Sequence, residues 1–98
     1  MLSNGKEFSI QDGNNLIGRW DPQDKSFPEI DLEEDDVDAK VSRRHCVIEK
    51  TGDKAILEDI GSLNGTFVNA VKVEQGQKAE LQSGDEVIIG KIKLRFEA

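Results

Sequence analysis

The feature that most constrains the fold is a series of short segments in which apolar and polar side chains alternate with a period of two. In the last of them, Ile92, Leu94 and Phe96 alternate with a lysine and an arginine, as in a β-strand with one buried face. The same reasoning predicts further strands at 7–10, 14–17, 47–50, 55–58, 66–68, 71–73, 78–81 and 86–89. Glycines punctuate these segments, so the sequence predicts an all-β sandwich or barrel.

Two turn sequences predict how neighbouring strands connect. Residues 51–54, Thr-Gly-Asp-Lys, have the composition of a turn between the strands at 47–50 and 55–58. Residues 11–13, Gln-Asp-Gly, predict a hairpin between the two N-terminal strands. Both turns would place consecutive strands side by side in one sheet.

Length and charge limit the functions open to this chain. Its 98 residues are enough for one domain, 1–98, and the last predicted strand lies close to the end of the chain, as expected for a domain excised from a larger protein. A net charge of −7 argues against a nucleic-acid binder, which needs a broad basic face. It leaves room for a local positive pocket that recognises a single phosphate group.

Neither a disulfide nor a membrane span is expected. Cys46 is the one cysteine, which excludes an internal disulfide and a cysteine-based metal site, and we expect a small buried thiol. The longest uninterrupted apolar run, 87–89, is far too short to cross a bilayer. Since the sequence also shows no leader, we expect a cytoplasmic protein that has no membrane partner.

Three polar segments fall at the ends of predicted strands, where loops carry function on a rigid sheet. They are Gly18-Arg19, Ser42-Arg43-Arg44-His45 and Ser62-Leu63-Asn64-Gly65-Thr66. An arginine fork fits two phosphate oxygens, a serine hydroxyl donates to a third, and an asparagine amide pairs with both sides of a peptide backbone. Taken singly, each residue has an ordinary explanation as a surface cation, a turn hydroxyl or a tight turn. Taken together, they are suited to grip a phosphate and the chain beside it.

The order of these segments resembles the forkhead-associated (FHA) domain family. The pattern of that family runs Gly-Arg, Ser-x-x-His, Ser-x-Asn-Gly-Thr and a late Gly-Asp. This sequence carries all four, the last as Gly84-Asp85, and the resemblance extends from about Gly5 to Phe96. It implies an FHA/SMAD-like β-sandwich of two antiparallel sheets, with about eleven short strands and with the ligand loops at one end.

The resemblance also implies a function in signalling. The domain would bind a phosphothreonine in a partner protein that a Ser/Thr kinase has phosphorylated. Arg19 and Ser42 would bind the phosphate, with Arg43 adding charge or a backbone contact. Asn64 would hold the peptide main chain, and Lys40 would contact ligand side chains beyond the phosphothreonine. Structural support of the site would fall to Gly18, His45, Gly65, Thr66 and Asn69.

The sequence departs from the family pattern in three places. Leu63 stands where threonine is frequent, so it cannot donate to the phosphate and becomes a second candidate for specificity. The stretch from Arg19 to Ser42 is longer than usual, and the surplus includes residues 20–28 and an acidic run. The first strand is short or absent before Gly5, which would leave a sheet edge unpaired.

Two features of the long stretch have two interpretations each. Six of the eight residues 31–38 are acidic. For residues 31–41 as a whole we favour a solvated loop over a helix. The alternative role of the acidic run is to select basic residues in the ligand. The run lacks the glycine and the spacing of an EF-hand calcium loop, so no metal site is expected. Trp20 is expected to be buried, with a partner surface as the alternative.

Two other functions compete with phosphothreonine binding. The sandwich could serve as a phosphate-independent scaffold that holds partner proteins on its sheet faces. An enzyme is disfavoured, because Ser42 and His45 lie three residues apart but the sequence has no Gly-x-Ser-x-Gly elbow and a single histidine. The resemblance gives that histidine a hydrogen-bonding role. We therefore expect a monomeric binding module with no catalytic residue, cofactor or metal.

Overall fold

The computed structural model describes residues 1–23 and 27–98, and these residues form eleven strands. The strands are β1 (Leu2–Ser3), β2 (Glu7–Phe8), β3 (Gly13–Gly18), β4 (Ile30–Asp31), β5 (Arg44–Thr51), β6 (Lys54–Asp59), β7 (Thr66–Val68), β8 (Val71–Val73), β9 (Lys78–Leu81), β10 (Glu86–Ile89) and β11 (Ile92–Phe96). Nine of the strands lie at the predicted alternating segments, and the two-residue strands β1 and β4 were not predicted. The predicted strands from residue 66 onward agree with β7 to β11 to the residue. Among the described residues, no helix has the length and apolar character needed to cross a membrane.

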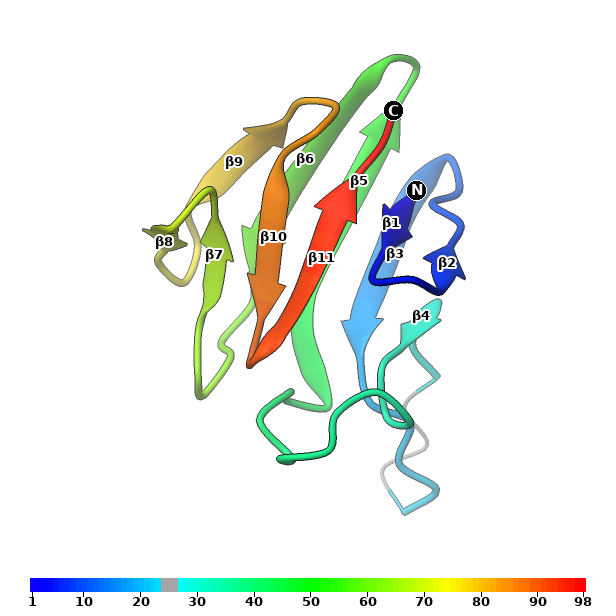
Figure 1. Cartoon of the computed structure of the whole chain (residues 1–98), viewed down its shortest axis with the longest axis vertical. Helices are drawn as coiled ribbons and strands as arrows, with labels where there is room; N and C mark the ends of the chain where they lie inside the picture. The colour runs from blue at the N-terminus through cyan, green and yellow to red at the C-terminus, as the bar shows by residue number, and fades with distance from the viewer. Residues whose placement is uncertain (24–26) are drawn as a thin grey trace.

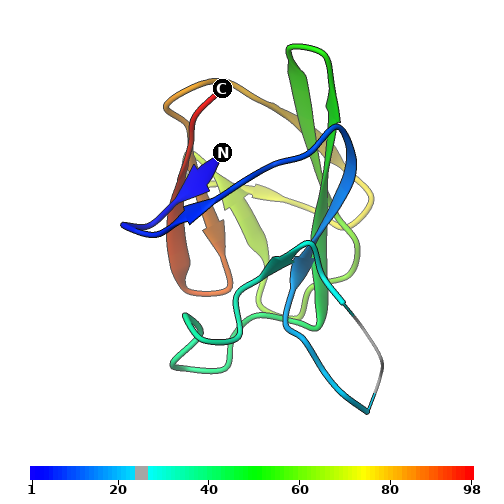
Figure 2. The same ribbon diagram turned by 90° about the vertical axis from the view of Figure 1, so that its right-hand side faces the viewer.

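The strands build two sheets that face each other, so the predicted sandwich is confirmed. One sheet has six strands in the order β2-β1-β11-β10-β7-β8, and the other has five in the order β4-β3-β5-β6-β9. Figure 1 shows the strands of both sheets, and Figure 2, turned by 90°, shows the sheets as two layers. Paired strands are antiparallel, except that β4 runs parallel to β3.

The core lies between the two layers and takes the apolar member of each alternating pair. In β11 the three apolar side chains are buried, whereas Lys93 and Arg95 are exposed. Cys46 of β5 belongs to this core and is fully buried, which confirms the predicted buried thiol. Burial raises the pKa of the Cys46 thiol far above its ordinary value, so the thiol stays protonated.

One predicted hairpin is confirmed and the other is wrong. Strands β5 and β6 pair around the turn at 52–53, but β2 and β3 belong to different sheets. Between them the chain crosses from one layer to the other, and the buried amide of Asn15 holds this crossing. It bonds to backbone groups of Gln11, Gly13 and Ile48 at 2.9 to 3.2 Å. Residues 11–13 thus have the composition of a turn but belong to a loop that joins the two layers.

The N-terminal strand is short but present. Strand β1 has two residues and pairs with both β11 and β2, so β11 is not left at an unpaired edge. The acidic stretch begins within the parallel strand β4 and continues as turns without a helix. The loop interpretation is therefore confirmed for 32–41, although Leu32 and Val41 within it are buried against the core.

Candidate phosphate-binding site

Three connecting segments meet at one end of the sandwich and carry the polar motifs. They join β3 to β4 (19–29), β4 to β5 (32–43) and β6 to β7 (60–65). Figure 1 shows all three at its lower end. The surplus segment 20–28 lies partly outside the described residues, at 24–26. We call this end of the sandwich, formed by the three segments, the loop end.

Gly18 allows the first two segments to approach each other. A Cβ atom at this position would lie 1.9 Å from the carbonyl oxygen of Arg43, so no side chain fits there. The register of β3 against β5 shifts between Ile17 and Gly18. The N–H of Arg19 then donates to the same Arg43 carbonyl at 3.2 Å. The glycine thereby brings Arg19 beside the segment that contains Ser42.

The Arg19 side chain is held at one nitrogen. Its Nε donates to the carbonyl oxygen of Val41 at 2.6 Å and lies 3.6 Å from Oδ2 of Asp36. Among the described residues, none accepts a hydrogen bond from either Nη nitrogen of Arg19. An arginine fixed in this way offers an oriented pair of donors to an anion.

Asp36 organises the segment before the serine motif, and sequence reasoning missed it. Its carboxylate accepts hydrogen bonds from the N–H groups of Lys40 at 2.8 Å and Val41 at 2.9 Å, besides facing Arg19. Its side chain is 2% exposed, whereas most other acids of the run are exposed. One member of the acidic run is therefore a buried support for the loop end rather than a solvated charge.

His45 connects the serine motif to the Asn-Gly turn. It is fully buried, its Nδ1 accepts from the N–H of Ser42 at 3.0 Å, and its Nε2 lies 2.8 Å from the carbonyl oxygen of Gly65. These partners require a neutral ring with its proton on Nε2. Burial lowers the pKa of His45, against a smaller opposing effect of the Gly65 carbonyl. Both ring nitrogens are engaged, which supports a structural role.

Ser42 keeps a donor proton at the centre of the loop end. Its hydroxyl oxygen accepts from the N–H of Leu63 at 3.0 Å, and within 1–23 and 27–98 its hydroxyl proton has no acceptor. Nearby, Nδ2 of Asn64 donates to the carbonyl oxygen of Lys40 at 3.0 Å. The same two segments are thus joined twice, and both Ser42 and Asn64 retain hydrogen-bonding capacity.

A second buried acid, Asp59, shapes the turn that carries Asn64. It accepts from the N–H groups of Gly61 at 2.8 Å and Ser62 at 3.0 Å, and from the hydroxyls of Ser62 and Thr66. Burial alone would raise the pKa of Asp59, but these donors outweigh burial and the pKa lies below its ordinary value. Sequence reasoning missed this residue, and the available signal was an acid just before a Gly-Ser turn.

Arg43 is engaged by an acid of the chain itself. Its Nε lies 2.6 Å from Oδ2 of Asp21, and the two side chains are 59% and 15% exposed. With Arg19, Trp20 and Pro22, this pair lines a small hollow of about 170 Å³. Both arginines therefore border one cavity in which a carboxylate is already present.

The prediction that Trp20 is buried is wrong. The residue is 44% exposed. Its backbone N–H donates to Oδ1 of Asp31 at 3.0 Å, at the start of the acidic run. The alternative, a surface that meets a partner, fits this position better. Of the two candidate specificity residues, Leu63 is 88% exposed and Lys40 is half-buried.

Asn69 is not among the residues that the fold brings together at the loop end. It lies in the turn between β7 and β8, with a positive φ of 49°. Its side chain donates to Oδ1 of Asp85 and accepts from the N–H of Glu86, both at 2.9 Å. It therefore stabilises turns at the opposite end of the sandwich (Figure 1), and its expected support of the site is indirect at most.

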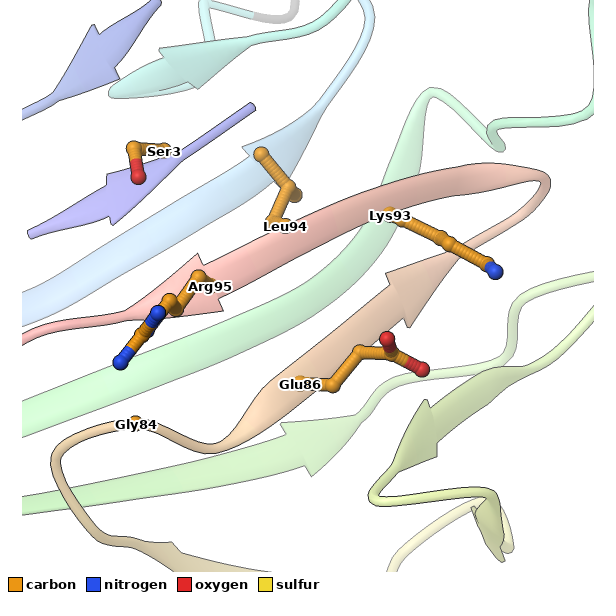
Figure 3. A pocket seen from close by; sticks show the side chains of 6 residues that line it. All are labelled: Ser3, Gly84, Glu86, Lys93, Leu94 and Arg95. Carbon is orange, nitrogen blue, oxygen red and sulfur yellow. The ribbon is translucent and has the colours of Figure 1, made fainter. Parts of the chain in front are cut away.

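A second hollow lies on the outer face of the six-stranded sheet. It measures about 330 Å³ and is lined by Ser3, Gly84, Glu86, Lys93, Leu94 and Arg95 (Figure 3). Nε of Arg95 is already paired with Glu97 at 2.7 Å, and Glu86 adds a negative charge. This mixed surface is a poorer anion site than the loop end. In the part of the chain that the structure describes, no group of three or more His, Cys, Asp or Glu could hold a metal ion.

Comparison with known proteins identifies the family. The family model for the FHA domain matches residues 15–90. An oxoglutarate dehydrogenase inhibitor of Corynebacterium jeikeium is 45% identical over 94% of this chain and 56% of its own length. The glycogen accumulation regulator GarA of Mycolicibacterium smegmatis is 46% identical over 94% of this chain and 51% of its own length. The chain spans about half the length of these curated relatives.

Solved structures similar to this chain point to the same family. An FHA domain from an analysis of phosphothreonine-dependent FHA interactions is 31% identical, with a TM-score of 0.80 over 99% of this chain and 91% of that chain. EmbR of Mycobacterium tuberculosis, in complex with a low-affinity phosphopeptide, is 28% identical, with a TM-score of 0.77 over 96% of this chain and 22% of its own. The relatives are named as an inhibitor and a regulator, in agreement with a binding module that is not an enzyme. Motifs, fold and relatives together show that this chain belongs to the FHA domain family of phosphothreonine-binding modules.

Proposed function

We propose that the loop end binds the phosphothreonine of a protein phosphorylated by a Ser/Thr kinase. In this proposal Arg19, Ser42 and Arg43 contact the phosphate, and Asn64 contacts the neighbouring main chain. The observation that carries it is that the Arg19 Nη groups and the Ser42 hydroxyl proton have no acceptor among the described residues, while the atoms around them are bonded. A phosphothreonine brings nearly two negative charges and three strong acceptor oxygens, which match these donors.

Little rearrangement would be needed for binding. Asp36, His45 and Asp59 hold the second and third segments, 32–43 and 60–65, through hydrogen bonds that are buried or partly buried. The conformational entropy of ordering these loops is therefore lost on folding and not on association, which favours affinity. Gly65 and Thr66 take part in the same network, and Lys40 and Leu63 flank it as candidates for reading the residues beside the phosphothreonine.

The proposed partner is a protein, bound by one domain formed by residues 1–98 acting as a cytoplasmic monomer. A net charge of −7 opposes association with polyanions such as nucleic acids or anionic membranes. The relatives named as an oxoglutarate dehydrogenase inhibitor and a glycogen accumulation regulator make metabolic control the first setting to examine. An oxoglutarate dehydrogenase is accordingly the first partner to test.

The test begins with a screen of degenerate phosphothreonine peptides. The best peptide is then titrated calorimetrically in its phosphothreonine, phosphoserine and unmodified forms. One hydrogen bond to a charged group contributes about 1.5–3 kcal/mol, so loss of the two Arg19 bonds in Arg19→Ala should weaken binding by about 100-fold or more. Ser42→Ala should weaken it by about tenfold or more, through one such bond.

Arg95→Ala is the matched control, because it removes an exposed arginine that is paired with Glu97 on a sheet face. It should bind like the wild type. If Arg19→Ala and Ser42→Ala also bound like the wild type, the assigned phosphate contacts would be wrong. Capture of a partner that survives phosphatase treatment of the lysate would instead support the phosphate-independent scaffold.

A further inference from the structure

Exposed apolar side chains are concentrated in the segments of the loop end. Among the described residues, five large apolar side chains are exposed, and four of these belong to the three segments of the loop end. The four are Trp20 (44%), Phe27 (70%), Val37 (92%) and Leu63 (88%). The fifth, Val71, lies on β8 and is 68% exposed. Single exposed apolar residues are normal on a protein surface, and the two that lie at the proposed phosphate-binding residues are Leu63, beside Ser42, and Trp20, beside the arginines.

Leu63 is exposed on a rigid turn. Its N–H bonds to the Ser42 hydroxyl at 3.0 Å, the preceding residue is held by Asp59, and the Asn64 side chain bonds to Lys40 at 3.0 Å. The backbone of Leu63 is therefore held beside the hydroxyl that we propose binds phosphate, and its side chain is exposed there. A peptide whose phosphate reaches Ser42 must pass over or beside Leu63.

Trp20 supplies apolar surface on the arginine side of the same site. It lines the hollow with Arg19 and Arg43, and its backbone is fixed by the bond to Asp31 at 3.0 Å. Tryptophan and arginine side by side in a partly enclosed site are typical of binding hot spots. An exposed apolar residue thus lies beside Ser42, and another lies beside the two arginines.

We propose that the natural ligand carries a large aliphatic or aromatic residue directly beside its phosphothreonine, and that Leu63 selects this residue. This inference rests on the proposed function. A small polar neighbour would leave the leucine in water, so its exposed surface would contribute nothing to affinity. An acidic neighbour would in addition be repelled by the run at 31–38. Contact with one open apolar surface should favour the apolar ligand by about tenfold, the low end for a single apolar group.

Two peptide pools provide the test. Both pools have a fixed phosphothreonine and degenerate outer positions. The two residues that flank the phosphothreonine are leucine in one pool and serine in the other. Wild type should bind the leucine pool about tenfold more tightly by fluorescence anisotropy. Leu63→Ser should reduce this ratio below about twofold. Val71→Ser, which makes the same kind of change on the exposed edge strand β8, should leave it at about tenfold.

Three outcomes would overturn the proposal. Equal binding of the two pools to the wild type would remove the apolar preference. A preference that survives in Leu63→Ser would show that Leu63 does not select the neighbour. Binding of neither pool by a folded sample, verified by circular dichroism, would refute the phosphothreonine site itself and this inference with it, so the two kinds of failure are distinguishable.

Discussion

The contact between Asp21 and Arg43 leads to a prediction about affinity. Oδ2 of Asp21 lies 2.6 Å from Nε of Arg43, at the edge of the hollow that both arginines line. A phosphate in this hollow must share Arg43 with the carboxylate and lie close to its negative charge. Asp21→Asn removes the charge but keeps the Oδ1 acceptor that bonds the N–H of Gln23 at 2.9 Å. We therefore expect this variant to bind phosphothreonine peptides more tightly than the wild type.

Two contributions determine the size of the gain. The first is the ion pair that the ligand must loosen, and exposed pairs contribute about 0.2–1 kcal/mol. The second is the repulsion between the carboxylate and a phosphate charge of about −1.5 to −2, which at roughly 6 Å in a water-like dielectric costs about 1 kcal/mol. Together they amount to about 1–2 kcal/mol, a gain in affinity of about five- to thirtyfold.

Calorimetric titration of one phosphothreonine peptide at low and high salt measures this gain. Asp12→Asn is the matched control, because Asp12 forms an exposed ion pair with Lys50 at 3.9 Å in the connection between β2 and β3. It removes the same net charge away from the loop end. The gain for Asp21→Asn should exceed that of the control and shrink at high salt. An affinity equal to or below that of the control would refute competition between Asp21 and the ligand.

Three further predictions concern the buried supports of the site, each measured by denaturant unfolding. Gly18→Ala should lower the free energy of unfolding by about 3 kcal/mol, because its Cβ would lie 1.9 Å from a carbonyl oxygen; a loss below about 1 kcal/mol would contradict this close approach. Asp36→Asn should cost about 1.5–3 kcal/mol, because the amide leaves one of two bonded N–H groups without an acceptor. Asp38→Asn, on the exposed part of the same run, is its control and should change little. Stability should also fall as pH drops below 6.5, the ordinary pKa of His45, because the pKa is lowered in the folded state and the unfolded state takes up the proton first. The loss should continue down to the folded pKa, and a flat profile below pH 6.5 would contradict a neutral, doubly bonded ring.

The strands could be predicted from the sequence because the information for them is local. Alternating residues between turn residues are sufficient to locate β7 to β11 to the residue. The crossing between β2 and β3 could not be predicted in this way. It depends on a bond from Asn15 to Ile48, 33 residues away in sequence, so a turn composition at 11–13 predicted a hairpin that does not exist.

Some residues of the candidate site could likewise be predicted from local sequence, and others could not because their role depends on the folded structure. Arg19, Ser42 and Asn64 could be singled out because their short motifs and their chemistry point to a phosphate. Asp36 and Asp59 could not, because their importance lies in burial and in the backbone N–H groups that they accept. Asp36 is one of six acids in eight residues, and composition does not separate it from its solvated neighbours. Trp20 was expected to be buried because tryptophans on average are, but it is 44% exposed at the loop end.

The charges at the loop end show that recognition must depend on geometry more than on net attraction. Arg19 faces Asp36 at 3.6 Å and Arg43 is paired with Asp21 at 2.6 Å, so the four side chains together carry no net charge. A ligand therefore gains little from one negative charge and much from oxygens placed to meet the arginine fork and the serine hydroxyl. We expect a peptide with glutamate in place of phosphothreonine to bind no better than the unmodified peptide, as measured by calorimetry. If the glutamate peptide bound within about tenfold of the phosphothreonine peptide, charge alone would be sufficient and the geometric explanation would fail.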